Sequence, residues 1–187
     1  MNWSEWHIPL SRSDLTLRHS LDSLAAVGTR QRAIPLIVRL LENPKYRLPG
    51  MTLFHGAVDL AAHDRIHILL GRGLLTADEA FTIGFTMGST KRVHCFEEWL
   101  FGTLARRVYP APYTFDDTAV CIFRDAVRLG GISGCQALNR VDFGPYLDLP
   151  LHEIRRQTGL EEDLLRAYYR IERERYPLSG ASRRLLD

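Results

Sequence analysis

The sequence predicts an all-α protein, a single-domain irregular bundle of about six to seven helices. Apolar residues recur at helical spacing through most of the 187 residues, and no alternating strand of convincing length is visible. With 45% hydrophobic and 25% charged residues, the composition is that of an ordinary globular protein. A chain of this length can bury one substantial core, so we predict one domain over residues 1–187.

Capping residues and helix breakers place the expected elements in order. We expect helices over about residues 13–27, 31–42, 51–70, 77–108, 114–129 and 150–157, and a last helix that ends near Glu174. A capping box from Thr158 to Glu161 opens this last helix, and Pro177 stops it. The segments 43–50 and 131–149 read as loops, the Gly130-Gly131 pair as a helix break, and residues from about 178 as a polar tail.

The helix expected over residues 77–108 is the longest and has no internal proline. Gly84 and Gly88 lie four residues apart within it, so one helical face lacks side chains there. Another backbone or a flat ligand can then come close, and tight packing is the commoner use of such a face.

Charge and cysteine content exclude several classes of protein. A formal net charge of +2 is too small to indicate a nucleic-acid-binding groove. The three cysteines form no close pair, which fits a reducing, cytoplasmic location. No segment approaches the ~20 apolar residues that span a bilayer, and no export signal is visible. Trp3 and Trp6 leave peripheral contact with a membrane open, and the sequence also leaves a homodimer open.

The most informative feature is a set of four metal-ligating residue types: His63, Asp64, His67 and Glu79. Two histidines four residues apart project from one face of a helix, and Glu79 would reach the same ion from the start of the next helix. Imidazoles and carboxylates suit zinc, iron, cobalt or manganese, so we predict one divalent metal ion of unassigned identity. The alternative is structural, since helical histidines are often simply packed and Thr76 to Glu79 also fits a capping box.

Two polar stripes at four-residue spacing extend this interpretation. The first comprises His55, Asp59, His63 and His67 on an otherwise apolar helix. Asp59 would then hold the distal nitrogen of His55 or His63, as carboxylates around metal sites commonly do. The second stripe follows the next helix: Thr82, Thr86, Thr90, His94 and Glu98.

Additional candidate site residues complete this set. We take His55, Asp59 and His94 as the candidate catalytic residues, with the two histidines as proton carriers. Arg65, Arg72 or Lys91 would pair with an anionic group of the substrate, although each taken alone reads as an ordinary surface charge.

The run from His63 to Glu79 resembles the hallmark of the fourth coenzyme Q (ubiquinone) biosynthesis family, the Coq-four family. Its pattern is His-Asp, two residues, His, eleven residues, Glu, and all four positions match here. The resemblance is specific over about 30 residues. It implies a helical fold, a bound divalent metal and a pocket for prenylated aromatic rings. The implied activity is oxidative decarboxylation or hydroxylation of an aromatic ring acid, or a scaffold role among the enzymes of that synthesis.

Two other classes of function remain open from the sequence. A metal-dependent phosphohydrolase of the HD type also uses a His-Asp doublet, and Asp116, Asp117 or Asp125 would supply its distant ligand. A non-catalytic lipid-binding or scaffold protein would use the metal only to tie two helices together. The leading expectation is a metal-dependent enzyme that acts on a small aromatic or prenylated molecule.

Overall fold

The computed structural model describes residues 3–27, 54–109, 111 and 114–186, and within them the protein is all-α. The helix predicted over 31–42 and the loop over 43–50 lie outside the described residues. The α-helices are α1 (Leu17–Ala26), α3 (Leu60–Leu70), α4 (Thr76–Ser89), α5 (Cys95–Arg107), α6 (Asp117–Ile132), α7 (Leu151–Thr158), α8 (Glu162–Arg175) and α9 (Gly180–Arg184). Short 3₁₀ turns span Leu138–Arg140 and Gly144–Tyr146. The described residues contain no strand, only an isolated bridge between Thr16 and Pro150.

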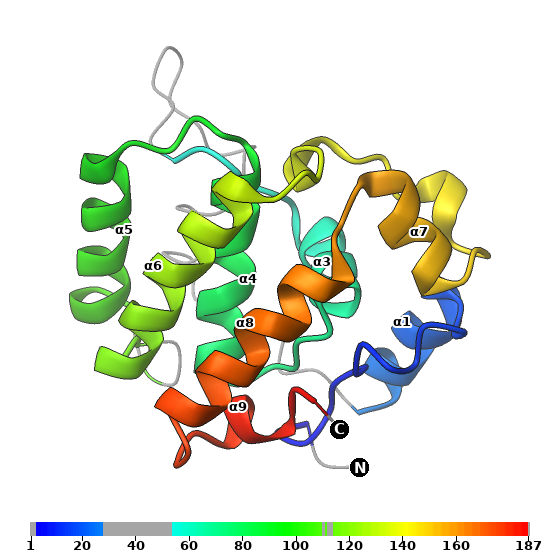
Figure 1. The fold of residues 1–187 in the computed structure, drawn as a ribbon, viewed down its shortest axis with the longest axis horizontal. Helices are drawn as coiled ribbons and strands as arrows, with labels where there is room; N and C mark the ends of the chain where they lie inside the picture. Colours follow the sequence, from blue (N-terminus) through cyan, green and yellow to red (C-terminus); the bar gives the residue numbers. More distant parts are fainter. Residues whose placement is uncertain (1–2, 28–53, 110, 112–113, 187) are drawn as a thin grey trace.

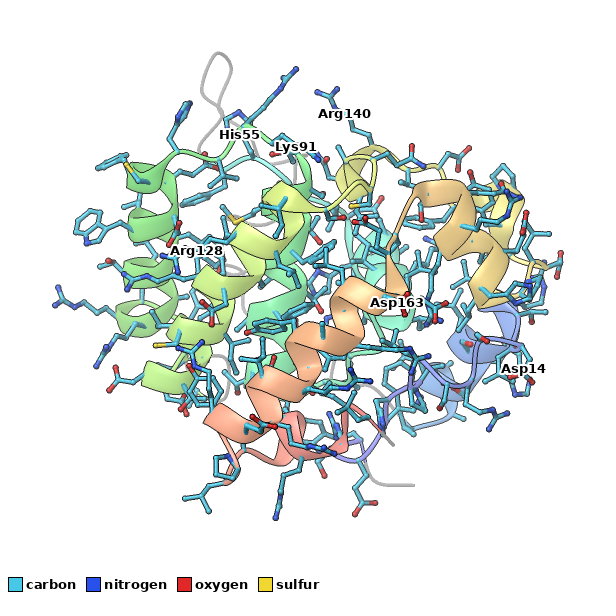
Figure 2. The ribbon with its side chains drawn as sticks, viewed as in Figure 1. Asp14, His55, Lys91, Arg128, Arg140 and Asp163 are labelled. Carbon is cyan, nitrogen blue, oxygen red and sulfur yellow. The ribbon has the colours of Figure 1, made fainter. Side chains whose placement is uncertain are left out.

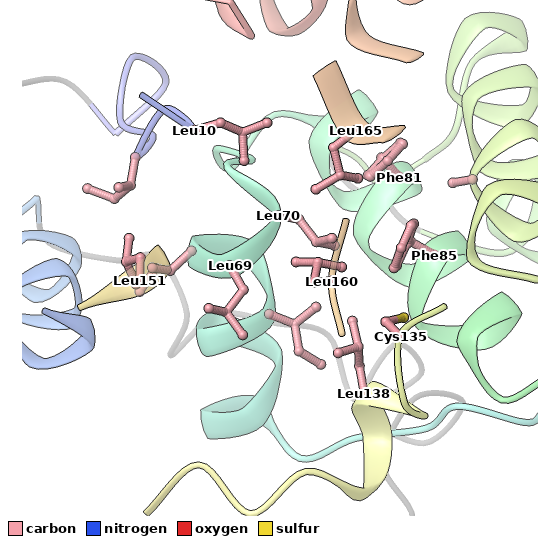
Figure 3. Close-up of a cluster of buried hydrophobic side chains, with 14 of the residues drawn as sticks. Leu10, Leu69, Leu70, Phe81, Phe85, Cys135, Leu138, Leu151, Leu160 and Leu165 are labelled. Atoms are coloured by element: carbon pink, nitrogen blue, oxygen red, sulfur yellow. The ribbon is translucent and has the colours of Figure 1, made fainter. Parts of the chain in front are cut away.

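Helix α4 lies between the two halves of the bundle (Figure 1). One core cluster contains side chains from α1, α3, α4, α7 and α8. Figure 3 shows part of it, with Leu70 of α3 on the side of Phe81 and Phe85 of α4 and Leu69 on the side of Leu151. The second cluster joins α4 to α5 and α6 and is rich in aromatic rings. Burial on both sides of α4 makes this helix the centre of the fold.

Glycines let α4 and α6 approach closely. A Cβ atom added to Gly84 or Gly88 would collide with carbonyl oxygens of α6, those of Phe123 and Val127. Gly130 on α6 meets the carbonyl of Phe85 in the same way. The backbone contact expected of Gly84 and Gly88 is confirmed. The expected break at Gly130-Gly131 is wrong, because α6 continues to Ile132 and uses Gly130 for packing.

Two of the predicted helices have different limits in the structure. The helix expected from residue 51 begins at Leu60, where the Asp59 carboxylate accepts a hydrogen bond from the Ala62 N–H at 2.8 Å. The long helix expected over 77–108 is two helices, because Lys91 has a φ of 57° that an α-helix does not permit. Residues four apart lie on one face only within a single continuous helix. Because each predicted helix is shorter or divided in the structure, neither polar stripe is continuous.

Both ends of the chain pack more closely than the sequence indicated. The polar tail predicted from residue 178 contains α9, and Ala181 and Leu185 in this region are buried. Trp6 is also buried and donates a hydrogen bond from Nε1 to Ser23 Oγ at 3.1 Å, so a membrane-contacting role for Trp6 is wrong. Among the described helices, none has the length and apolar character needed to cross a bilayer.

Candidate metal centre

A tight turn brings the end of α3 against the start of α4. Gly71 ends α3 with a left-handed φ of 71°, a conformation that glycine adopts without strain. The Arg72 N–H donates to the His67 carbonyl oxygen at 2.9 Å and closes this turn. Helix α4 then begins at Thr76, with the Leu75 N–H donating to the Asp78 carboxylate at 3.1 Å. The last turn of α3 therefore faces the first turn of α4.

Three side chains converge at this junction, His63 and His67 from α3 and Glu79 from α4; we call them the donor triad. The Nε2 atom of His63 lies 2.9 Å from Glu79 Oε2 and 2.9 Å from His67 Nε2. The third separation, from His67 Nε2 to Glu79 Oε2, is 3.3 Å. The predicted convergence of two consecutive helices on one point is thus present.

The three separations match the distances between neighbouring ligands of one metal ion. Ligand atoms about 2.1 Å from an ion lie roughly 3.0 to 3.4 Å apart at right or tetrahedral angles. The three atoms that face one another are two imidazole nitrogens and a carboxylate oxygen. Unless a proton lies between two of them, each atom presents only a lone pair to its neighbours. A divalent cation removes this mutual repulsion, so the residues present fit a metal ion.

The donor triad is buried on one side and accessible on the other. The side chain of His67 is fully buried, whereas 15% of the His63 side chain and 27% of the Glu79 side chain are exposed. Burial alone would raise the pKa of Glu79, but the neighbouring imidazoles of His67 and His63 hold that pKa well below its usual range. Glu79 is therefore an ionised carboxylate across the physiological pH range.

A hydrogen bond behind His67 orients its ring. Thr82 Oγ1 lies 3.3 Å from His67 Nδ1, and Thr82 is fully buried one turn after Glu79 on α4. If Nε2 presents its lone pair to a cation, Nδ1 carries the proton and donates it to the Thr82 hydroxyl. The Thr82 hydroxyl is therefore compatible with the ring form of His67 that would bind a metal ion.

The remaining candidate ligand, Asp64, does not belong to the donor triad. It lies about 100° around the helix from His63, which directs its side chain elsewhere. The upstream carboxylate Asp59 also differs from expectation, because it caps α3 and does not orient a histidine ring. His94 is exposed and occupies the N-cap position of α5, apart from the donor triad.

His55 lies outside α3 but adjoins the site. Its ring Nδ1 is 2.8 Å from Glu97 Oε2, and Glu97 is a buried residue in the first turn of α5. Figure 2 shows His55 at the upper edge of the view, near the connection between α4 and α5. The sequence did not point to Glu97, because one continuous helix was predicted over residues 77–108 and the helix start at Cys95 was not foreseen.

A small cavity of about 20 Å³ connects this histidine with the metal site. His55 and His63 both line it, and its other described walls are mainly apolar, among them Ile83, Met87 and Phe101. The volume suits one molecule about the size of water.

The three basic residues predicted to pair with a substrate anion have other surroundings. Arg72 is fully buried between the rings of Phe81 and Tyr169 and donates to both oxygens of Glu172, at 2.9 and 2.6 Å. Lys91 donates from Nζ to the carbonyl oxygen of Ser133. Arg65 lies in α3 and is partly buried. Arg72 is thus a structural residue, and its predicted substrate role is wrong.

The aspartates that a phosphohydrolase would require do not join the donor triad. Asp116 caps α6 through the Ala119 N–H at 2.7 Å, and Asp117 pairs with Arg106. Asp125 pairs with Arg175 at 2.8 Å. With Asp64 also outside the triad, the arrangement does not favour the HD-type interpretation.

Comparison with protein-family models, with curated proteins and with solved structures found no match.

Proposed function

We propose that this protein is a metal-dependent enzyme in which His63, His67 and Glu79 bind one divalent transition-metal ion. The observation that carries this proposal is the mutual approach of three electron-pair donors, 2.9 to 3.3 Å apart, with no Lys or Arg side chain of the described residues bonded to them. Three protein ligands are the usual number in catalytic zinc sites, where a further position takes water or substrate. Partial exposure of His63 and Glu79 provides access from solvent.

The resemblance to the Coq-four family suggests the substrate class. We propose an aromatic ring acid, with or without a prenyl chain, that undergoes oxidative decarboxylation or hydroxylation with dioxygen as the oxidant and source of the new ring oxygen. A bound divalent ion would act there as a Lewis acid toward a carboxylate or phenolate oxygen. His63, His67 and Glu79 would hold the ion, and Thr82 would hold the ring of His67 in its metal-binding form.

Elemental analysis of protein purified without added metal tests the first half of this proposal. We expect about one transition-metal ion per chain, because one donor triad is present. Iron or cobalt would favour redox chemistry. Protein that carries no metal and binds none on addition would refute the proposal.

Release of labelled carbon dioxide tests the second half. The metal-loaded protein would be incubated with carboxyl-labelled aromatic acids, both plain and prenylated. Glu79→Gln should abolish release, whereas His94→Gln, a change at an exposed histidine outside the triad, should leave it unchanged. Equal release by wild type and Glu79→Gln would show that the triad does not take part.

A structural metal is the second candidate, favoured by the full burial of His67 and by ligands from two consecutive helices. In that case chelation unfolds the protein outright. A catalytic ion with an open position predicts a folded apo-protein with a lowered melting temperature. Melting curves with and without chelator distinguish the two candidates.

A further inference from the structure

We infer that His55 and Glu97 form a proton-accepting pair beside the metal site. His55 would contact a water or hydroxyl group bound to the ion, and Glu97 would be the positioning residue that fixes its ring. This inference rests on the proposed function, because it requires an ion in the donor triad. It adds Glu97, a residue that the sequence pattern did not include, and gives His55 a defined atom and partner.

Glu97 holds His55 at two points. One carboxylate oxygen lies 2.8 Å from the ring Nδ1, and the other accepts the backbone N–H of His55. The Glu97 side chain is 9% exposed, so little water competes for its oxygens. A two-point hold on one residue fixes both its backbone and its ring.

The residues on either side of His55 are anchored to different helices. Phe54 is buried, with its ring 5.2 Å from that of Phe101 on α5 and perpendicular to it. Gly56 has a φ of 89°, and a Cβ there would approach the Met87 Cα on α4 to 2.7 Å. Only glycine tolerates both that conformation and that contact. His55 is thus placed on a short segment that spans from α5 to α4.

The two Glu97 contacts determine which ring nitrogen of His55 carries the proton. A carboxylate accepts hydrogen bonds, so Nδ1 is the protonated nitrogen in the neutral ring, and Nε2 keeps a free lone pair. Nε2 is therefore available to accept a proton from a donor in the cavity. After transfer both ring nitrogens carry protons, and the negative charge of Glu97 stabilises the imidazolium.

The cavity supplies the donor. His55 and His63 line the same water-sized space of about 20 Å³, and His63 is a member of the donor triad. A water bound to the ion becomes a stronger acid, since the cation withdraws electron density from its oxygen. With an ion held by His63, His67 and Glu79, His55 Nε2 would accept the proton that such an acidified water or hydroxyl group gives up, and Glu97 would hold the charged ring in place.

Nitrogen NMR of the histidine rings tests the inference, with zinc alone as the probe. In the wild type with neutral rings, we expect His55 to show a protonated Nδ1 and an unprotonated Nε2. Zinc should move the Nε2 signal of His55 upfield, because the zinc-bound water donates to it. The signal of His152, whose Nδ1 lies 2.9 Å from the Ser13 carbonyl oxygen on an exposed surface, should not move.

Glu97→Gln is the decisive variant because it preserves the shape of the side chain. The amide would donate to Nδ1, so the His55 proton should move to Nε2, and the zinc-induced shift should disappear. Zinc affinity should stay unchanged in Glu97→Gln and in His55→Gln, because His55 and Glu97 bond to each other and not to a member of the donor triad. A residue that held a triad ring would instead cost about 10- to 100-fold in affinity when removed.

The outcomes separate this inference from the proposed function. An Nε2-protonated His55 in the wild type overturns the inference, and so does a zinc-loaded triad that leaves the His55 signal in place. Unchanged signals of His63 and His67 on zinc addition would instead overturn the proposed function. Should either variant fail to fold, the wild-type tautomer and its response to zinc still decide the matter.

Discussion

Two polar clusters flank the connection between α3 and α4, and they differ in charge balance. The donor triad contains lone-pair donors only. The second, which we call the ionic cluster, comprises Arg72, Asp78, Glu172, Ser182 and Arg184. There two guanidinium groups match two carboxylates, and Ser182 donates to Glu172 Oε1 at 2.9 Å. Asp78 and Glu79 are adjacent in sequence, yet one belongs to each cluster.

This difference shows how to distinguish a structural from a functional cluster. The ionic cluster supplies its own counter-charges and buries the side chains of Arg72, Asp78 and Glu172 completely. Burial would lower the pKa of Arg72, but Glu172, Tyr169 and Asp78 raise it above its usual value, so it stays charged. The donor triad lacks an internal cation and is partly exposed. An incomplete cluster that can reach solvent is the one expected to take a ligand.

Breaking the ionic cluster should have the largest effect on stability. Glu172→Leu leaves the Arg72 charge buried without its main partner, and such changes cost about 3–5 kcal/mol. The double variant Arg72→Met/Glu172→Leu should recover most of that loss. Denaturant unfolding measures both. Asp148→Asn, which removes an exposed partner of Arg18, serves as control and should leave stability unchanged. A Glu172→Leu protein as stable as this control would contradict the assignment.

Removing one ligand of the donor triad should weaken metal binding. We expect His67→Gln to weaken zinc or cobalt binding by at least about 100-fold, since it removes a ligand itself. The wild type should gain about 2.7 kcal/mol in unfolding free energy at a metal concentration 100 times its dissociation constant. At the same metal concentration the gain should fall to about 0.4 kcal/mol or less in His67→Gln and persist in His152→Gln. Calorimetric titration and unfolding curves provide both quantities, and an unaltered affinity would refute the triad.

Alkaline pH should weaken the ionic cluster through Tyr169. This fully buried ring packs on Arg72, and its hydroxyl donates to the Leu70 carbonyl oxygen at 2.5 Å. Burial raises the pKa of Tyr169 to about 12. This value is above the pKa near 10 of an unfolded tyrosine. The neutral Tyr169 side chain therefore contributes fully to the free energy of unfolding below pH ~10, and this contribution is lost as the pH rises toward about 12.

The loss expected from Tyr169 over that interval is roughly 2–3 kcal/mol of unfolding free energy, in addition to any from Tyr168, whose pKa burial also raises. Tyr169→Phe should unfold with a weaker pH dependence in the same range, as measured by denaturant titrations at successive pH values. A wild-type curve that is flat between these limits would show that Tyr169 is not protected by burial. The donor triad should play no part in this interval.

The smallest effect concerns the hydrogen bond behind His67. Thr82→Val removes the hydroxyl that lies 3.3 Å from His67 Nδ1 and should weaken zinc binding about tenfold. Thr86→Val is a matched control, because the Thr86 hydroxyl donates to the Thr82 carbonyl oxygen within α4. Equal affinities of the two variants would mean that Thr82 does not orient the ring.

Local patterns predicted part of the site and of the fold. The i, i+4 spacing of His63 and His67 and the turn after Gly71 were sufficient to predict that the two helices bring these histidines and Glu79 together, but the prediction also included Asp64, which is not in the group. Sequence spacing did not reveal that Asp59 caps α3, since a helix start depends on the φ and ψ angles of the residues before it. Glu97 and Glu172 are far in sequence from their partners, His55 and Arg72. Such contacts follow from helix packing, which a single sequence does not specify.

Anomalous X-ray diffraction from crystals of the cobalt- or zinc-loaded protein tests the central claim most directly. We predict a single strong peak about 2.1 Å from His63 Nε2, His67 Nε2 and Glu79 Oε2. If crystals soaked in excess metal show no peak among these atoms, or show a peak only at other residues, the claim that the donor triad binds metal is contradicted.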